Sequence, residues 1–144
     1  MISVTVANPY EYTLDFPALK AAAKAVLEGE SVKAAKIGLA FVDDTHIHRL
    51  NKQFLNHDEP TDVITFPYSQ PKAAKLEGEI VIGYQVAEEN AKDRGHDVNT
   101  ELLLYVIHGC LHLCGFDDTT PKAEKLIRAK ERQYLMQLKL PDIA

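Results

Sequence analysis

The chain has 144 residues, of which 46% are hydrophobic and 26% are charged. This is the size of about one ordinary domain, and we expect residues 1–144 to fold as a single unit around a hydrophobic core. The 16 Lys and Arg against 21 Asp and Glu give a net charge of −5. That balance argues against a protein that coats nucleic acid through bulk charge, but it leaves local basic patches open.

Cysteine content and hydropathy predict the cellular compartment of the protein. It has two cysteines, no cleavable apolar leader after Met1 and no apolar run near the roughly 18 residues needed to span a bilayer. We therefore expect a reducing aqueous compartment, most simply the cytoplasm, and no membrane partner.

Strands and helices alternate in the first half of the chain. Residues 2–7 alternate like a strand, and residues 15–17 then open a helix to about residue 28, with a proline near the first turn where its missing donor does no harm. The apolar run 36–42 is typical of a buried strand. The polar residues 43–45 that follow can cap a short helix reaching Phe54.

Two more strands precede a helical second half. β-Branched residues predict a strand over 61–66, and a second compact strand is expected over 78–83, after a polar loop that contains proline. Three helices are then expected, over 84–93, 99–114 and 121–138. The predicted fold class is α+β, with a single sheet of about four strands covered by helices and a central buried helix.

That central helix carries two histidines one turn apart. Residues four apart on a helix have Cβ atoms about 5–6 Å from each other, so His108 and His112 can direct two ring nitrogens at one ion at the roughly 2.0–2.1 Å typical of zinc. The stretch before them is apolar almost all round, which indicates a helix buried on most faces. Two core histidines that donate to backbone carbonyls are the alternative, and the ligand spacing favours the metal site.

A sharp turn after the histidines supplies a third ligand. Gly115 can end the helix in the left-handed region at little steric cost, and the chain then reverses toward two carboxylates. The spacing selects Asp118 as the third ligand, because it repeats the elongated zinc-site pattern in which the residue three beyond the glycine closes the triad. Asp117 is then a candidate either to support a ligand or to fix the loop.

Three protein ligands leave one coordination position open, which is typical of a catalytic rather than a structural zinc. The usual metalloprotease signature needs Glu directly after the first histidine as general base. This chain has Gly109 there, so peptide hydrolysis by that mechanism is disfavoured.

Three other residues of the central helix call for an interpretation. Glu101 lies two turns before His108 on the same face, about 700° around the axis; it is a candidate to orient an imidazole, or else an acidic residue favoured in the first turn. Cys110 and Cys114 point about 160° away from the histidine face. We interpret them as buried small hydrophobic residues.

The last predicted helix has an apolar and a basic face. The apolar face carries Ala123, Leu126, Ile127 and Tyr134, and the basic stripe carries Lys122, Lys125, Arg128 and Arg132. The stripe could contact phosphates, or it could be a solvated face, which is the commoner design of surface helices.

Residues 108–118 resemble the signature of the bacterial YbeY family, single-domain metal-dependent endoribonucleases of ribosomal RNA maturation. A second block supports the resemblance: Leu50-Asn51 followed by residues 58–67 is similar to the family's stretch before and along a sheet-edge strand, and residues 78–82 are similar to its next strand. The similarity spans about residues 50–135 in the right order and spacing.

The resemblance implies that His108, His112 and the residue at 118 bind one zinc ion per chain. It implies single-strand-specific hydrolysis of RNA phosphodiester bonds by a water that the metal activates, in ribosomal RNA processing and ribosome quality control. No side-chain nucleophile is needed. The expected partners are ribosomal RNA precursors, with ribosomal subunits or assembly factors, and no DNA.

Two positions depart from the family pattern. Many members carry a third His where this chain has Asp118; a carboxylate oxygen is a normal zinc ligand, but its harder character widens the choice of metal, with zinc still expected. At the position of Leu55, typical members have an Arg thought to meet the RNA backbone or the developing charge. Lys52 and His57 lie close in sequence and are the candidates to replace it.

Two other functions stay open. One is a non-catalytic ribosome-assembly module whose metal stabilises the helix turn, which the missing Arg at position 55 favours. The other is a small metallohydrolase acting on peptides or nucleotides, which Gly109 disfavours. Metal removal discriminates a structural from a catalytic ion, because structural zinc is linked to the free energy of folding.

Overall fold

The computed structural model describes all 144 residues and contains one four-stranded sheet and five helices, so the predicted α+β class is confirmed. The strands are β1 (Ile2–Ala7), β2 (Ala35–Val42), β3 (Val63–Pro67) and β4 (Leu76–Gly83). The helices are α1 (Phe16–Gly29), α2 (Asp44–Leu55), α3 (Tyr84–Arg94), α4 (Val98–Leu113) and α5 (Pro121–Gln137). None of these helices is both long enough and apolar enough to cross a bilayer.

The strands are ordered β1-β2-β4-β3 across the sheet. β2 pairs in parallel with β1 and with β4, where Leu39 lies opposite Ile80, while β3 pairs antiparallel with β4 and forms an edge. Parallel neighbours require a crossover connection, and α1 supplies it between β1 and β2. The crossover places α1 on one face of the sheet.

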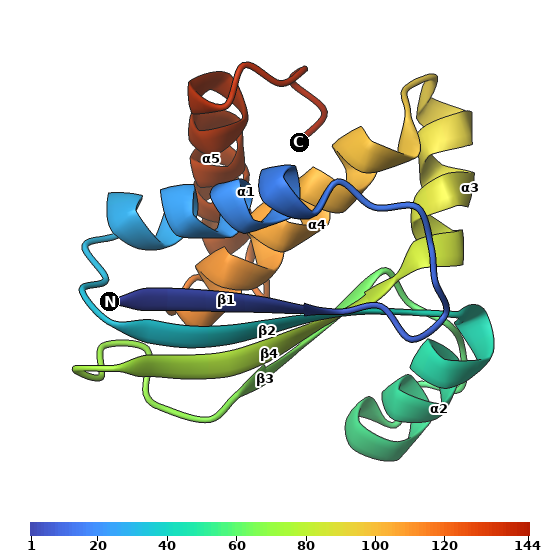
Figure 1. Cartoon of the computed structure of the whole chain (residues 1–144), viewed down its shortest axis with the longest axis horizontal. Coiled ribbons are helices and arrows are strands. Elements are labelled where there is room, and N and C mark those ends of the chain that lie inside the picture. The colour runs from blue at the N-terminus through green and yellow to red at the C-terminus, as the bar shows by residue number, and fades with distance from the viewer.

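Helices cover the two faces of the sheet unequally (Figure 1). α1 and α4 pack on one face and bury the main core, a cluster of 27 residues that includes Leu39 and Ile80. α2 covers one end of the opposite face, where Ile47 packs against a small second cluster with Ile64 and Val81. Alternation along the strands explains this division, because successive side chains point to opposite faces.

α4 is the central buried helix that the sequence predicts. Twelve of its 16 residues are buried, and it lies directly on β4. A Cβ atom at Gly109 would meet the Cγ2 atom of Ile80 at 2.8 Å and its Cδ1 atom at 2.9 Å. Gly109 therefore lets α4 approach the sheet closely, which gives this residue a packing role at the position where a metalloprotease has its glutamate.

Candidate metal centre

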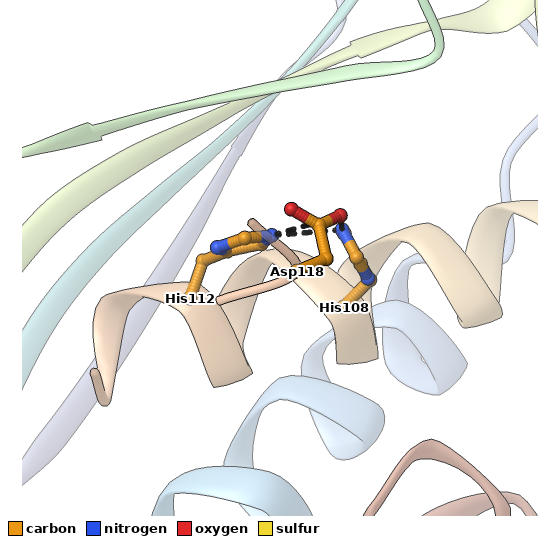
Figure 2. A group of neighbouring side chains, drawn as sticks. All are labelled: His108, His112 and Asp118. Carbon is orange, nitrogen blue, oxygen red and sulfur yellow. Dashed lines mark hydrogen bonds and ion pairs between the residues drawn. The ribbon is translucent and has the colours of Figure 1, made fainter. Parts of the chain in front are cut away.

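His108 and His112 lie one turn apart on α4 and direct their rings at the same point (Figure 2). Their Nε2 atoms are 2.9 Å apart, and the side chains are 14% and 23% exposed. The rigid, buried helix thus fixes two nitrogen donors that remain accessible to an ion from solvent.

The turn after α4 brings a carboxylate to the same point. Gly115 adopts a φ of +105°, its N–H donates to the His112 carbonyl at 3.0 Å, and the N–H of Phe116 donates to the Leu111 carbonyl at 3.0 Å. This paired pattern is a Schellman motif, which satisfies the last carbonyls of the helix. The reversed chain leaves the Oδ2 atom of Asp118 3.9 Å from the His108 Nε2 and 4.0 Å from the His112 Nε2.

Asp117 fixes this loop and does not join the group. Its Oδ1 atom accepts hydrogen bonds from the backbone N–H of Thr119 at 3.2 Å and from the Thr119 hydroxyl at 3.1 Å. Of the two roles considered for Asp117, the structure therefore shows the loop-fixing one.

The three donor atoms have the chemistry and spacing to hold a divalent cation. They all lie within 4.8 Å of one another, and their separations of 2.9 to 4.0 Å bracket the roughly 3.3 Å between ligand atoms in a tetrahedral zinc site. Two neutral imidazoles that face each other this closely need a proton or a cation between them. Two nitrogens and one carboxylate oxygen suit zinc, and the oxygen also admits harder divalent ions.

A buried carboxylate from α5 orients one of the histidines. The Oε2 atom of Glu131 lies 2.6 Å from the Nδ1 of His108, and Glu131 is fully buried. A carboxylate has only acceptors, so His108 must donate its Nδ1–H. In the neutral ring, the form that binds a metal, the Nε2 lone pair then faces His112 and Asp118. Carboxylate partners of this kind are typical of metal-binding histidines.

Arg128 holds Glu131 in turn. Its Nη1 atom donates to the Glu131 Oε1 at 2.8 Å. Burial by itself raises the pKa of Glu131, but the hydrogen bond and charge of His108, with those of Arg128, outweigh it and keep the pKa below its usual value. Glu131 is therefore ionised at neutral pH despite its burial.

His112 is held in its neutral form. Burial lowers its pKa, and the neighbouring His108 lowers it further, against the opposing effect of three nearby carboxylates. A histidine must be neutral to bind a metal. The environment of His112 thus favours the protonation state that a ligand needs.

Glu101 does not orient His108 or His112; of its two interpretations, the structure shows the acidic residue in the first turn of α4. Glu101 is buried in the first turn of α4, where its Oε1 atom lies 2.6 Å from the His96 Nε2 and 3.3 Å from the Arg94 Nη1. The seven residues that separate it from His108 correspond to about 10 Å along the helix axis. That rise exceeds the reach of the carboxylate, and the α3–α4 connection supplies closer partners.

Lys52 and Leu55 lie in the last turn of α2, and His57 lies just beyond its end. No hydrogen bond or ion pair joins any of the three to His108, His112 or Asp118. Leu55 is 49% exposed. Lys52 is exposed, with its Nζ atom 3.9 Å from the Asp58 Oδ1. The candidate roles of Lys52 and His57 stay predictions.

The cysteines lie behind the histidine face, as their helical phase indicates, and both are free thiols. Cys110 is fully buried, and Cys114 is half-buried. Burial and the nearby Glu30 raise the pKa of Cys114 to about 11. Both thiols are therefore protonated at neutral pH, and neither joins the group of donors.

The predicted faces of α5 are only partly correct. Ile127 and Tyr134 are buried, but Leu126 is 53% exposed. Of the basic stripe, Arg128 binds Glu131, and Arg132 lies 3.3 Å from the Asp142 carboxylate. The sequence interpretation missed Glu131, although a signal was present: an acidic residue that falls between apolar positions on the buried side of an amphipathic helix needs a partner.

Comparisons with known proteins agree with the geometry. A family model described as endoribonuclease YbeY matches residues 8–139. An endoribonuclease YbeY of Elusimicrobium minutum is 46% identical over 83% of this chain and 85% of that protein, and one of Chlorobium luteolum is 35% identical over 95% and 98%. A solution structure of a Thermotoga maritima protein is similar with a TM-score of 0.67 and 30% identity, over 96% of this chain and 89% of that one.

Proposed function

This chain belongs to the endoribonuclease YbeY family, and from that premise we propose that it hydrolyses single-stranded RNA at a metal ion held by His108, His112 and Asp118. The family resemblance stated from the sequence is confirmed, and RNA is the substrate of an endoribonuclease. The finer proposal is one zinc ion per chain, with residues 1–144 as a single hydrolase domain. Its proposed substrates are ribosomal RNA precursors in the cytoplasm, cleaved during maturation and quality control with ribosomal subunits or assembly factors as partners.

The observation that carries this proposal is the convergence of three donor atoms with a fixed tautomer. Glu131 holds the proton of His108 on Nδ1, so the Nε2 of His108 faces the Nε2 of His112 as an acceptor. The group offers three ligands, and this number leaves an open position in a tetrahedral site.

A divalent ion bound there would supply Lewis acidity toward a phosphoryl oxygen and would lower the pKa of a water molecule. The protein residues bind the ion and keep its ligands in place: α4 positions both histidines, and the Gly115 turn positions Asp118. Position 109 offers no general base, since Gly109 packs against Ile80. The proposed reaction thus requires no side-chain nucleophile.

A structural role for the metal has less support. The main core contains 27 buried residues and none of the three donors, so the fold does not depend on the site for its packing. A non-catalytic assembly module with a structural ion would be expected to place its ligands where they join elements that otherwise lack a core.

Metal content by mass spectrometry and cleavage of a labelled single-stranded RNA test the proposal together. We expect about one zinc per native chain, with cleavage that a chelator abolishes and zinc restores. Asp118→Ala and His112→Ala should lose metal and activity, and Asp118→His should keep metal. His46→Ala serves as the control that keeps both, because His46 lies on α2 with its Nδ1 atom 3.0 Å from the Tyr10 hydroxyl. Metal-free native protein that cleaves RNA at full rate would overturn the proposal.

A further inference from the structure

A polar hollow adjoins the candidate metal centre on the side of α5. It has a volume of about 360 Å³, and Asp118 itself forms part of its wall. Apart from Pro121, every side chain that lines it is polar or charged. The lining residues used below are Asp118, Thr119, Thr120, Glu124, Lys125 and Arg128.

Arg128 is fixed in this wall by a buried group. Its guanidinium donates to Glu131, which is fully buried and also holds His108. A guanidinium has five N–H donors, and the structure records a protein acceptor for Arg128 only at Glu131. Its side chain is 40% exposed. Arg128 therefore presents an oriented cation with free donors beside a proposed metal ligand.

Lys125 adds a second cation on the same face. It lies three residues before Arg128, a spacing that places two helical side chains side by side. Lys125 is exposed and forms no ion pair. Glu124 opposes these charges in the same hollow. If Asp118 binds the metal, two cations face one carboxylate, and the hollow favours an anion.

We propose that this hollow is a binding site for the RNA phosphate next to the one that is cleaved, with Arg128 and Lys125 as its cationic contacts. This inference rests on the proposed function, because the metal position defines where the cleaved phosphate lies. A strand that passes through the metal centre brings a neighbouring phosphate toward Asp118 and the hollow. Phosphate contacts fix the register of a strand without reading its sequence. The site therefore positions the RNA backbone along α5 whatever the base sequence.

Charge variants in and beside the hollow test this site by fluorescence anisotropy with a labelled RNA decamer. Gel electrophoresis of each sample checks that the decamer is intact, so that binding is measured apart from cleavage. Lys125→Gln removes a cation that does not touch Glu131. Glu124→Gln removes the opposing charge. Lys122→Gln is the matched control, because it makes the same charge change on the same helix outside the lining.

We expect Lys125→Gln to weaken binding roughly three- to tenfold and to reduce the slope of log affinity against log salt by about 0.7, the value of one single-strand phosphate contact. Glu124→Gln should tighten binding, and Lys122→Gln should leave the slope unchanged. The site is refuted if Lys125→Gln and Lys122→Gln behave alike, or if Glu124→Gln fails to tighten binding. RNA cleavage by the native chain is measured in parallel: binding with these charge effects but no cleavage would refute the proposed hydrolysis alone.

Discussion

Glu131 joins two other side chains, one from α4 and one from its own helix, α5. Its two oxygens accept hydrogen bonds from His108 on α4 and from Arg128 on α5. Breaking a buried ion pair by removing one partner costs about 3–5 kcal/mol, because the other charge stays buried and unpaired. The position of His108 and the orientation of Arg128 therefore depend on one carboxylate.

Replacing this carboxylate with its amide tests its effect on the metal. We expect Glu131→Gln to lower zinc affinity about 10- to 100-fold, the usual effect of changing a partner of a metal-binding histidine. The amide oxygen is a weaker acceptor for the Nδ1–H of His108. The amide NH₂ group can also donate to Nδ1, which would favour the tautomer that carries its proton on Nε2 and cannot bind the metal there. Competition with a chromophoric chelator measures the affinity, and circular dichroism checks the fold.

Glu124→Gln is the control, since it removes the same charge from an exposed position of the same helix. Equal zinc affinity of the native chain and Glu131→Gln would show that the hydrogen bond to His108 has no effect on the metal.

The residues of the candidate site differ in how far the sequence predicts them. His108, His112 and Asp118 fall within 11 consecutive residues, so helical spacing and one turn bring them together. Glu131 reaches His108 across 23 positions, and only tertiary packing of α5 on α4 defines that pair. The same limit explains why the sequence left two interpretations of Glu101 open, since Glu101 shares a helical face with His108 but not its neighbours.

At the scale of elements, α4 depends on close contact with β4. Gly109→Ala should destabilise the protein by about 1–3 kcal/mol, the usual cost of overpacking, because the added Cβ would approach three side-chain atoms of the fully buried Ile80. Alanine's higher helix propensity, about 1 kcal/mol, offsets part of that cost. Urea unfolding measures the change. Gly38→Ala is the control, since its Cβ would meet only ordinary contacts at 3.5 Å and beyond.

The start of α4 gives the fold a dependence on acid. Asp97 is the N-cap and accepts from the backbone N–H of Thr100 at 2.8 Å. That hydrogen bond, with the one from the Thr100 hydroxyl, holds the pKa of Asp97 below its usual value. The stabilisation from ionised Asp97 is therefore fully present above its unfolded pKa and is lost as the pH falls through the lower, folded pKa.

Asp97→Ala should accordingly cost about 1 kcal/mol at pH 7, as is usual for loss of an N-cap. The difference in unfolding free energy between the native chain and the variant should shrink as the pH falls below about 4, because the carboxylate is protonated in the unfolded chain before it is protonated in the folded one. Urea unfolding at a series of pH values measures both. A difference that stays constant down to acid pH would contradict the role of the charged cap.

The elements themselves are well predicted because each has a local signal. The predicted helix and strand ends agree with the structure to within two residues, since caps, prolines and hydrophobic periodicity act over short distances. The strand order β1-β2-β4-β3 and the place of α2 on the opposite face could not be predicted. Both depend on pairing between segments far apart in the sequence, which local patterns do not specify.

At the scale of the whole molecule, the acidic net charge and the cationic hollow act at different distances. A net charge of −5 repels RNA at long range. Salt screens this repulsion, so that at 0.1 M ionic strength it extends only about 10 Å, the Debye length. Contacts of Arg128 and Lys125 with phosphate act only at short range. A strand therefore binds through local contacts along the face that carries Asp118 and α5.

Chelation of the metal should leave the whole fold intact. The main core buries 27 residues without any of the three donors, so the helical circular dichroism spectrum should persist in EDTA. The metal should add stability only by binding to the folded state, about 2.7 kcal/mol at a free concentration 100 times its Kd. Calorimetric melting with and without zinc measures this shift, and RNA cleavage is followed in the same samples.

His112→Ala is the control for this experiment, because its melting temperature should not respond to zinc. If EDTA instead unfolds the native chain, the ion is structural, since a domain with a sufficient core of its own does not lose its fold with its metal. Retained folding with lost cleavage would show that the core holds the fold without the metal. The sheet, α1 and α4 form most of that core, and α5 both contributes to it through Tyr134 and supplies Glu131 to the site.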